Sequence, residues 1–365
     1  SKQYRRTCEH VRKDKSEVPW SALSYLYLLL RSGMQPETDI SKDADYLVGR
    51  LADQAAKTSS PEEDAMAAIV LNAHGRQKDA IDRMDKVCRL VSHKDGCYLA
   101  YPSGDGISID RKLQAHVQVM EAVCEVMPDS THIINGLTEW LLQQKRTQQW
   151  DDPVRTVNAV HALVKQDGKS LADASSDVLR LRDSGVTRRL PAPDGAMGCV
   201  CDSAKVDAPS LLTIEKRSSS LSWGAVFATY EMPMDSVRAH WQGFRIRRDI
   251  PAGAARVGDR LHVRYTVTAD RDYDFVSLRT TRPAATEPAS KVSGYASQGT
   301  IGYYMEVRDT GCEYYFDSMP RGTYVIEEDW IVERTGEYVT GSASIRCVYA
   351  PEYQSNMSGA RLVVE

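Results

Sequence analysis

The sequence SGYASQGTIGYYMEVRDTGCEYYFDSMPRGTYVIEEDWIVERTGEYVTGSASIRCVYAPEY, residues 293–353, alternates short β-type runs with glycine turns within a chain of 365 residues. The runs are rich in tyrosine, valine and isoleucine, which favour strands. The turns carry glycines at positions 299, 302, 311, 322, 336 and 341. This spacing of strands and turns is typical of an antiparallel sandwich. The tail of the chain is therefore predicted to be a β domain without a helix of its own.

Upstream of that stretch, a regular alternation of apolar and polar residues indicates a strand with one buried face and one solvent-exposed face. The apolar positions are Leu261, Val263, Tyr265, Val267 and Ala269, and the polar ones are His262, Arg264, Thr266 and Thr268. Further strands are predicted at Phe275–Leu278, Tyr303–Arg308, Tyr314–Phe316, Thr323–Val332, Ser342–Tyr349 and Arg361–Val364. Together these runs predict a sandwich of about 110 residues.

Between Gly168 and Trp241, short strand-like segments are separated by long loops. The segments are Val178–Leu181, Leu211–Lys216 and Trp223–Tyr230. Glycine, proline and serine turns divide them, so this part is predicted to be β structure with long connections.

The first half of the chain is predicted to be helical from its caps and its period. The run Ser60-Pro61-Glu62-Glu63 supplies an N-cap, a proline at the first helical position and a capping-box glutamate, and Gly75 ends that helix. A second amphipathic run extends from Lys78 to Val91. The loop after it carries Tyr98 and Tyr101.

Later helices follow the same rules. One apolar stripe consists of Leu113, Val117, Met120, Val123 and Met127. Ser130 is expected to cap the next helix, and Asp152-Pro153 to open the last one. Counting from Trp20, about seven helices joined by short turns are expected. Such helices pack as antiparallel hairpins, and the period does not distinguish a bundle from a solenoid or a toroid.

The composition is that of a globular protein. The apolar fraction is 42%, the charged fraction is 26%, and the net charge of −4 gives no bulk attraction to nucleic acid or to anionic lipid. No stretch approaches the roughly 20 apolar residues that a membrane helix needs. Ser1 is not an initiator methionine and residues 1–6 lack the apolar core of a signal peptide, so we expect a piece of a longer polypeptide.

The sequence carries no familiar catalytic or ligand-binding motif. It has no glycine-rich phosphate loop, no His-Glu-x-x-His zinc helix and no Gly-x-Ser-x-Gly elbow. The eight cysteines are scattered and are expected to be mostly small buried residues, and Cys199-Val200-Cys201 alone is a weak metal signal. The helical histidines 74, 116, 132 and 161 are expected to be packed or half-exposed side chains. We therefore predict no catalytic residue, no cofactor and no metal.

Several short pieces of the C-terminal half resemble, in their order, bacterial alpha-2-macroglobulin-like proteins. They are Trp223-Gly224-Ala225, Val257-Gly258-Asp259, Asp270-Arg271-Asp272-Tyr273, Ser293-Gly294-Tyr295, Gly302-Tyr303-Tyr304, Arg308-Asp309, Pro320-Arg321-Gly322-Thr323-Tyr324 and Tyr349-Ala350-Pro351-Glu352. In the helical half, Trp140-Leu141-Leu142-Gln143-Gln144-Lys145 and Trp150 with Thr156-Val157-Asn158-Ala159-Val160 resemble the end of that family's α/α toroid. The resemblance covers the chain from about residue 130 onward, and each piece alone is unspecific.

The resemblance implies a multidomain α and β architecture. Residues 1–167 would be a partial α/α toroid of the thioester-domain type, truncated at its start. Residues 168–245 would be the returning half of a split CUB-like β domain, and residues 246–365 the terminal macroglobulin-type β-sandwich.

The resemblance also implies a non-enzymatic role in a larger envelope or periplasmic protein. In this family, cleavage of an upstream bait segment triggers a conformational change that traps the attacking protease, and many members add a covalent link through a Cys-Gly-Glu-Gln thioester. No cysteine here has that context, so either the motif lies upstream of Ser1 or the parent belongs to a branch that lacks it. We expect trapping without a functional thioester, because the tail most resembles the versions from gut-type bacteria, which lack the motif. Proteases would be the partners of the full-length parent, and the sequence does not indicate an oligomeric state.

One residue-level expectation follows from the resemblance. Thioester-bearing members carry a Met-Tyr pair before the Pro-Glu of the terminal sandwich, and this pair shields the thioester. Tyr349 matches the tyrosine and Val348 replaces the methionine. We expect Val348 and Tyr349 to form an inter-domain contact, with the tyrosine ring directed inward and its hydroxyl bonded.

Two other classes of function stay open at this point. The helical half could be a glycan-processing enzyme, with Tyr98, Tyr101, Trp140 and Trp150 lining a cleft beside Asp105 or Asp110. Alternatively, the sandwich could be an envelope adhesion or scaffold module that binds through a sheet edge or a loop.

Overall fold

The computed structural model describes residues 2–34, 38–54, 60–89, 91–92, 96–99, 109–167, 178–181, 187–189, 203, 205, 211–217, 226–233, 236–251 and 254–365. The chain divides into two compact units. The helical unit comprises Ser1–Leu142 and Trp150–Trp223, and the sandwich unit comprises Gln143–Gln149 and Gly224–Glu365.

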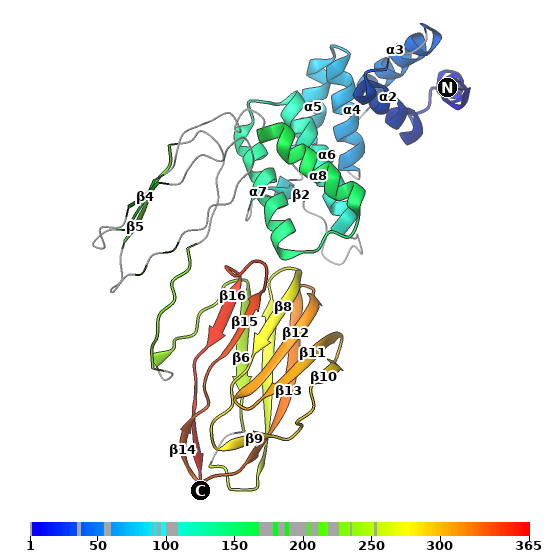
Figure 1. The fold of residues 1–365 in the computed structure, drawn as a ribbon. Coiled ribbons are helices and arrows are strands. Elements are labelled where there is room, and N and C mark those ends of the chain that lie inside the picture. The colour runs from blue at the N-terminus through cyan, green and yellow to red at the C-terminus, as the bar shows by residue number, and fades with distance from the viewer. Residues whose placement is uncertain are drawn as a thin grey trace. The chain divides into compact units, whose positions relative to one another are not determined.

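Eight helices lie in the described residues up to position 167 (Figure 1). They are α1 (Lys2–Asp14), α2 (Trp20–Ser32), α3 (Thr38–Asp53), α4 (Pro61–Ala73), α5 (Gln77–Cys88), α6 (Ile109–Val126), α7 (Thr131–Thr147) and α8 (Pro153–Asp167). Seven of them begin at Trp20 or later, which confirms the expected helical half.

Helix α4 is the central helix of this unit. Every residue from Asp64 to Leu71 is buried, and α4 packs against α2, α5 and α6. Because it is surrounded by helices, it needs an apolar surface on most sides rather than on a single stripe. Pro61 occupies the first helical position as predicted, but the Ser60 side chain makes no capping hydrogen bond within the described residues. Instead, the Ser60 carbonyl accepts from the amides of Glu63 and Asp64 at 3.1 and 3.2 Å.

The Asp152 cap of α8 is confirmed. Its Oδ1 accepts hydrogen bonds from the amides of Val154 and Arg155 at 2.9 and 3.2 Å. These bonds satisfy donors that a helix N-terminus leaves unpaired.

Helix α5 is shorter than the sequence indicates. It ends at Cys88, and Val91–Ser92 (β1) pairs with Tyr98–Leu99 (β2), so the predicted extension of the helix to Val91 is wrong. Val91 and Leu99 lie opposite each other and are both buried, and the Cys97 amide donates to the Gly136 carbonyl at 2.7 Å. The burial of a β-branched residue opposite a leucine explains why a strand replaces the last helical turn.

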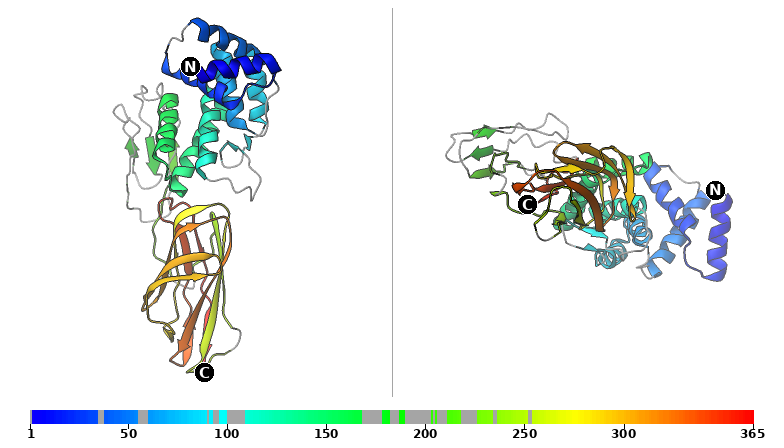
Figure 2. Two further views of the ribbon diagram at one scale, coloured as in Figure 1. Left: turned by 90° about the vertical axis from the view of Figure 1, so that its right-hand side faces the viewer. Right: turned by 90° about the horizontal axis from the view of Figure 1, so that it is seen from below.

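The sandwich unit is antiparallel throughout its ladders. Its larger sheet has the order β10-β11-β12-β8-β15-β16, its smaller sheet has the order β6-β7-β13-β9, and β14 pairs with β17. The strands are β6 (Phe244–Asp249), β7 (Arg260–Ala269), β8 (Tyr273–Arg279), β9 (Thr286–Pro288), β10 (Gly294–Gln298), β11 (Ile301–Arg308), β12 (Gly311–Met319), β13 (Gly322–Val332), β14 (Gly336–Val339), β15 (Ala343–Cys347), β16 (Gln354–Met357) and β17 (Arg361–Val364). Figure 2 shows these strands from two further sides.

The predicted alternation in β7 is confirmed. Its burial pattern alternates along the strand with the apolar residues inside, and β7 pairs with β13 from Ala269 opposite Gly322 to Arg260 opposite Ile331. The largest fully buried side chains of this core are Trp330, Tyr265, Tyr273, Tyr314 and Phe316. Aromatic side chains dominate because each buries a large area between the two sheets.

Some strand predictions need correction. Residues 226–230 of the predicted strand Trp223–Tyr230 are irregular and exposed, whereas Trp223–Ala225 lie outside the described residues. A small sheet forms from β3 (Val178–Leu181), β4 (Thr187–Arg189) and β5 (Leu212–Glu215). The strand β6 begins at Phe244 and pairs with β7. The proposed domain boundaries stay a prediction.

Candidate functional site

The loop after β15 presents the two residues that the sequence singled out. We call residues 348–352 the Tyr349 loop. The Cys347 amide donates to the Tyr353 carbonyl at 3.0 Å, and the Tyr353 amide donates to the Ala350 carbonyl at 2.9 Å. These bonds close the loop at its base, so its shape is held by the backbone.

Phe275 on β8 supports the Tyr349 loop from the neighbouring strand. Its carbonyl accepts a hydrogen bond from the Val348 amide at 2.8 Å, and its ring meets the Tyr349 ring edge-on, with centroids 5.1 Å apart and planes at 89°. Phe275 adopts a left-handed φ of 56°, which is uncommon for a bulky residue. Because such a conformation costs about 1–3 kcal/mol, the surrounding contacts must hold it in place.

Within the sandwich unit, both predicted residues lie at the surface. The Val348 side chain is 43% exposed and that of Tyr349 is 66% exposed, while Ala350 is buried below them. The Tyr349 ring therefore lies at the surface, where Phe275 supports it, and is not packed into the core of its own unit. The expected inter-domain contact stays a prediction.

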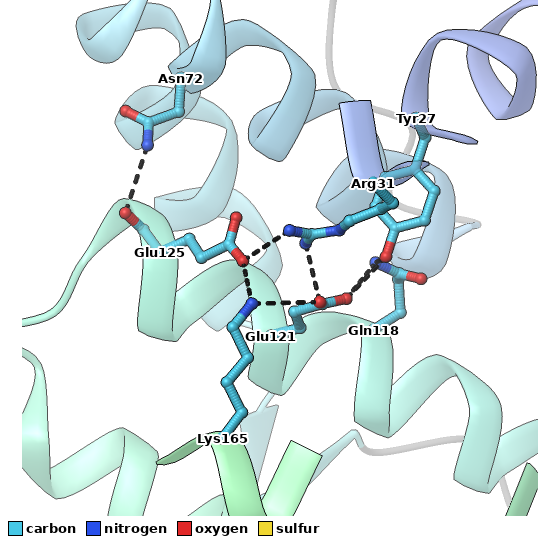
Figure 3. Close-up of polar contacts among 7 residues, drawn as sticks. All are labelled: Tyr27, Arg31, Asn72, Gln118, Glu121, Glu125 and Lys165. Carbon is cyan, nitrogen blue, oxygen red and sulfur yellow. Dashed lines mark hydrogen bonds and ion pairs between the residues drawn. The ribbon is translucent and has the colours of Figure 1, made fainter. Parts of the chain in front are cut away.

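A cluster of four charged side chains lies in the helical unit and joins three helices (Figure 3). Arg31 on α2 lies between two carboxylates of α6, with 2.8 Å from Nη2 to Glu121 Oε1 and 2.8 Å from Nη1 to Glu125 Oε1. Lys165 on α8 reaches the same oxygens, at 2.6 Å from Glu125 Oε1 and 3.6 Å from Glu121 Oε1. We call these four residues the charge cluster.

Neutral polar groups complete the surroundings of the charge cluster. The Tyr27 hydroxyl donates to Glu121 Oε2 at 2.7 Å, and Gln118 Nε2 donates to the Tyr27 oxygen at 3.3 Å. Asn72 on α4 donates to the Glu125 carbonyl at 3.2 Å, and the Arg31 guanidinium lies 5.0 Å from the centroid of the Tyr27 ring. The charge cluster therefore connects α2, α6 and α8, and Asn72 adds a bond from α4 to the backbone of α6.

Mutual pairing sets the protonation of the charge cluster. Burial alone would raise the pKa of Glu125, but the hydrogen bonds from Arg31 and Lys165 outweigh it and lower that pKa. The hydrogen bond to Glu125 raises the pKa of Lys165. The Glu125 carboxylate thus stays ionised beside two cations and is not held protonated as a general acid would be.

The residues of the hypothetical glycan-processing site are only partly brought together. The rings of Tyr98 and Trp140 lie 6.2 Å apart at 21°, and the His116 ring lies 4.2 Å from that of Trp140. Trp150 packs against the helical core. Tyr101 and Asp105 lie outside the described residues, as does the side chain of Asp110, so no pair of carboxylates beside these rings is established.

The described thiols have no activated character. Cys8, Cys97, Cys312 and Cys347 are buried and Cys88 and Cys124 are half-buried, as the sequence predicted for most of them. Burial raises the pKa of Cys88 and of Cys124 to about 11 and that of Cys312 to about 12. Cys199 and Cys201 lie outside the described residues, and no group of three or more possible metal ligands occurs among the residues that the structure describes.

Sequence reasoning missed the charge cluster. A local signal exists, because Tyr27 and Arg31 are spaced for one face of a helix, and so are Glu121 and Glu125. However, Arg31 and Glu125 are 94 residues apart, and no periodicity indicates which helices become neighbours.

Among the described residues, no helix is long and apolar enough to cross a membrane.

Comparison with known proteins identifies the sandwich. Residues 238–352 match the family model described as the bacterial alpha-2-macroglobulin MG10 domain. No curated protein matches the chain. Among solved structures, it is similar to trypsin-activated alpha-2-macroglobulin from Escherichia coli, with 12% identity, a TM-score of 0.44, and coverage of 94% of this chain and 23% of that one.

Two further solved structures are similar to the chain with lower TM-scores. Salmonella alpha-2-macroglobulin reacted with methylamine shares 15% identity, with a TM-score of 0.31 and coverage of 94% of this chain and 22% of that one. A native Escherichia coli portion from domain MG7 to the C-terminus shares 12% identity, with a TM-score of 0.32 and coverage of 94% and 54%. The chain thus spans about a quarter of the length of the first relatives, at 23% and 22%. Residues 238–352 thus match the MG10 domain of bacterial alpha-2-macroglobulins, and the chain is similar to the C-terminal region of those proteins.

Proposed function

We propose that this chain is the C-terminal portion of a bacterial alpha-2-macroglobulin that inhibits proteases by trapping them through a conformational change. The match of residues 238–352 to the MG10 domain model carries this proposal. The protein is then a non-enzymatic inhibitor of the cell envelope or periplasm, and its partners are proteases. The paired carboxylates and protonated thiols of the described sites support a binding role over a catalytic one.

We further propose that trapping proceeds without a thioester supplied by this chain. None of its eight cysteines is followed by Gly-Glu-Gln. In addition, burial raises the pKa of the described thiols, which keeps them protonated and weakly nucleophilic. Treatment of the full-length protein with methylamine should therefore leave the mass of the peptides derived from residues 1–365 unchanged.

The Tyr349 loop is proposed as the docking element of the terminal sandwich. Its support by Phe275 and the 66% exposure of Tyr349 suit an aromatic anchor that fills a site on another part of the parent. Since Val348 replaces the methionine of thioester-bearing members, the loop would hold domains together rather than shield a reactive bond.

The decisive experiment uses the full-length protein and trypsin. Cleavage should fall in one upstream region, and the hydrodynamic radius should change afterwards. The trapped trypsin should still cleave a small chromogenic substrate while losing activity on a large protein substrate. Unchanged radius together with undiminished activity on the large substrate would show that the protein does not trap proteases.

A matched pair of variants tests the Tyr349 loop. Tyr349→Ala removes the exposed ring and should alter the rate or extent of the trypsin-induced change. Val339→Ala on β14 alters a side chain that is also exposed, at 46%, and should leave the response unchanged. Identical responses of both variants would remove the proposed role of Tyr349 while leaving the trapping function untouched.

A further inference from the structure

The two edge strands of the larger sheet differ in whether other residues bond to their outer side. At one edge, β16 is covered: the His240 amide donates to the Asn356 carbonyl and the Asn356 amide donates to the His240 carbonyl, both at 2.9 Å. The Gln242 amide also donates to Ser355 Oγ at 2.9 Å. The opposite edge is β10, which pairs with β11 on one side only among the described residues.

The hairpin between β10 and β11 fixes which backbone groups of β10 face outward. Gln298 lies opposite Ile301, so Gly299 and Thr300 form a two-residue loop, and Gly299 has the positive φ of 61° that such a turn needs. In this geometry, Gln298 exchanges hydrogen bonds with Ile301, and the bonded positions then alternate along the strand. The N–H and C=O groups of Tyr295 and Ser297 therefore point away from β11.

The β10 edge is short but lacks the charged side chains and the prolines that often prevent pairing. Its residues, Gly294 to Gln298, include no charged side chain and no proline. Residues 295–297 are exposed, and the Tyr295 side chain is 86% exposed, with its ring edge-on to that of Tyr304 at a centroid distance of 5.1 Å. Just before the strand, Val292 is 75% exposed. An open backbone edge thus lies beside exposed aromatic and apolar surface.

We propose that β10 binds an extended, uncharged peptide segment of a partner protein, which adds to the larger sheet as a further strand. The outward donors and acceptors of Tyr295 and Ser297 match those of another extended backbone, which can bond to both residues at once. The neutral edge offers no charge to select an acidic or basic segment. Peptide side chains on the same face would then pack on the ring of Tyr295, which the ring of Tyr304 on β11 supports from the other side.

The dimensions of the edge favour a peptide over a second copy of the chain. With five residues, β10 supplies outward groups from Tyr295 and Ser297 only. A stable dimer usually buries about 1,200 Å² or more, which such a short edge alone does not provide. This inference does not depend on the proposed trapping function.

Binding of a short peptide of alternating valine and threonine to the whole chain tests the proposal. Ser297→Pro removes only an outward N–H, which an edge strand tolerates, and Ser297→Ala is the matched control that keeps this donor. We expect the proline variant to weaken binding by about tenfold or more and the alanine variant to bind as the native chain does. Bound peptide should also slow hydrogen exchange at the amides of Tyr295 and Ser297. Circular dichroism of Ser297→Pro verifies that the sandwich is intact.

Other results would overturn the proposal. Equal binding by the two Ser297 variants would place the peptide elsewhere. Concentration-dependent dimers that Ser297→Pro abolishes would identify a second copy as the occupant. Binding of a chitin oligosaccharide that is lost in Tyr295→Ala but kept in Ser297→Pro would show that the exposed tyrosines stack on sugars instead. Absence of binding at millimolar peptide would also reject the site.

Discussion

The carboxylate of Glu328 accepts a 2.9 Å hydrogen bond from the indole Nε1 of Trp330, two residues further along the same strand and on the same buried face. The other oxygen of Glu328 accepts from the hydroxyls of Thr280 at 2.6 Å and Tyr314 at 2.8 Å. A carboxylate that is only 8% exposed is thereby provided with three donors. It joins β12, β13 and the residue that follows β8 across the core between the two sheets.

Replacement of Glu328 should destabilise the sandwich in proportion to the donors it leaves unpaired. We expect Glu328→Leu to lower the free energy of unfolding by about 3 kcal/mol, because three buried donors lose their acceptor. Glu328→Gln keeps the shape but turns an amide group toward a donor, and it should cost about 1–2 kcal/mol. Urea denaturation, with hydrogen exchange of the β13 amides as a local probe, measures both.

The neighbouring Glu327 is the control for Glu328. Its carboxylate lies on the outer face of β13, where it pairs with Arg264 at 2.9 Å. Since this pair is exposed, Glu327→Gln should change stability by less than about 0.5 kcal/mol. Equal effects of the two glutamine variants would mean that the hydrogen bonds of Glu328 do not stabilise the core.

We expect the two cations of the charge cluster to contribute unequally to the free energy of unfolding. Arg31 has a 27% exposed side chain and bridges two carboxylates, whereas the Lys165 side chain is 47% exposed. We expect Arg31→Met to cost about 2 kcal/mol and Lys165→Met less than about 1 kcal/mol. Because both cations serve the same carboxylates, the double variant should cost more than the sum of the two. Strict additivity in a double-mutant cycle, measured by thermal unfolding, would show that the four residues do not act together.

The parts of the fold that the sequence predicted are those whose signals are local. The alternation of β7 is visible because one of its faces is buried over ten residues, and the Asp152 cap is visible because it acts within three residues of itself. The strands that were missed, such as β10 and β16, read GYASQ and QSNM and have little β propensity. They are strands because a neighbouring strand pairs with them.

A predicted strand that does not form also shows that β propensity alone does not decide where strands lie. Val226, Phe227 and Tyr230 have high β propensity, yet residues 226–230 form no strand and are exposed. For the site, Tyr349 was found through a resemblance in the order of motifs, whereas its support by Phe275 depends on a register that joins residues 74 positions apart. No local pattern contains that information.

The buried ion pair of Arg83 with Asp64 should be intolerant of single changes. Arg83 Nη1 donates to Asp64 Oδ1 at 2.7 Å, and its Nη2 donates to the carbonyls of Leu51 at 2.9 Å and Gln54 at 2.7 Å. Asp64 is 1% and Arg83 7% exposed, so the loss of either partner leaves a buried charge uncompensated. We expect Asp64→Ala or Arg83→Met to lower the free energy of unfolding by about 3–5 kcal/mol. Arg76→Met, which removes the exposed pair with Asp79 at 3.9 Å, should have little effect in the same urea titration.

His116 predicts a pH dependence of the helical unit. Its ring is 1% exposed, lies against Trp140, and has one partner within the described residues, the Leu137 carbonyl at 2.9 Å from Nε2. Burial lowers its pKa from 6.5 to about 4. Above pH 6.5 the ring is neutral in both folded and unfolded chains, and it adds no pH dependence. As pH falls from 6.5 toward 4, the unfolded chain binds a proton that the folded chain does not.

The unfolding free energy should therefore decrease between these two pH values, by about 3 kcal/mol in total from this residue. His116→Gln keeps a donor for the Leu137 carbonyl but does not titrate, so it should reduce the slope of stability against pH in this window. Urea denaturation of both proteins at several pH values measures the difference. The same slope in the two proteins would mean that the buried ring is protonated without penalty, and a nuclear magnetic resonance titration of the His116 ring would then show a pKa near its ordinary value.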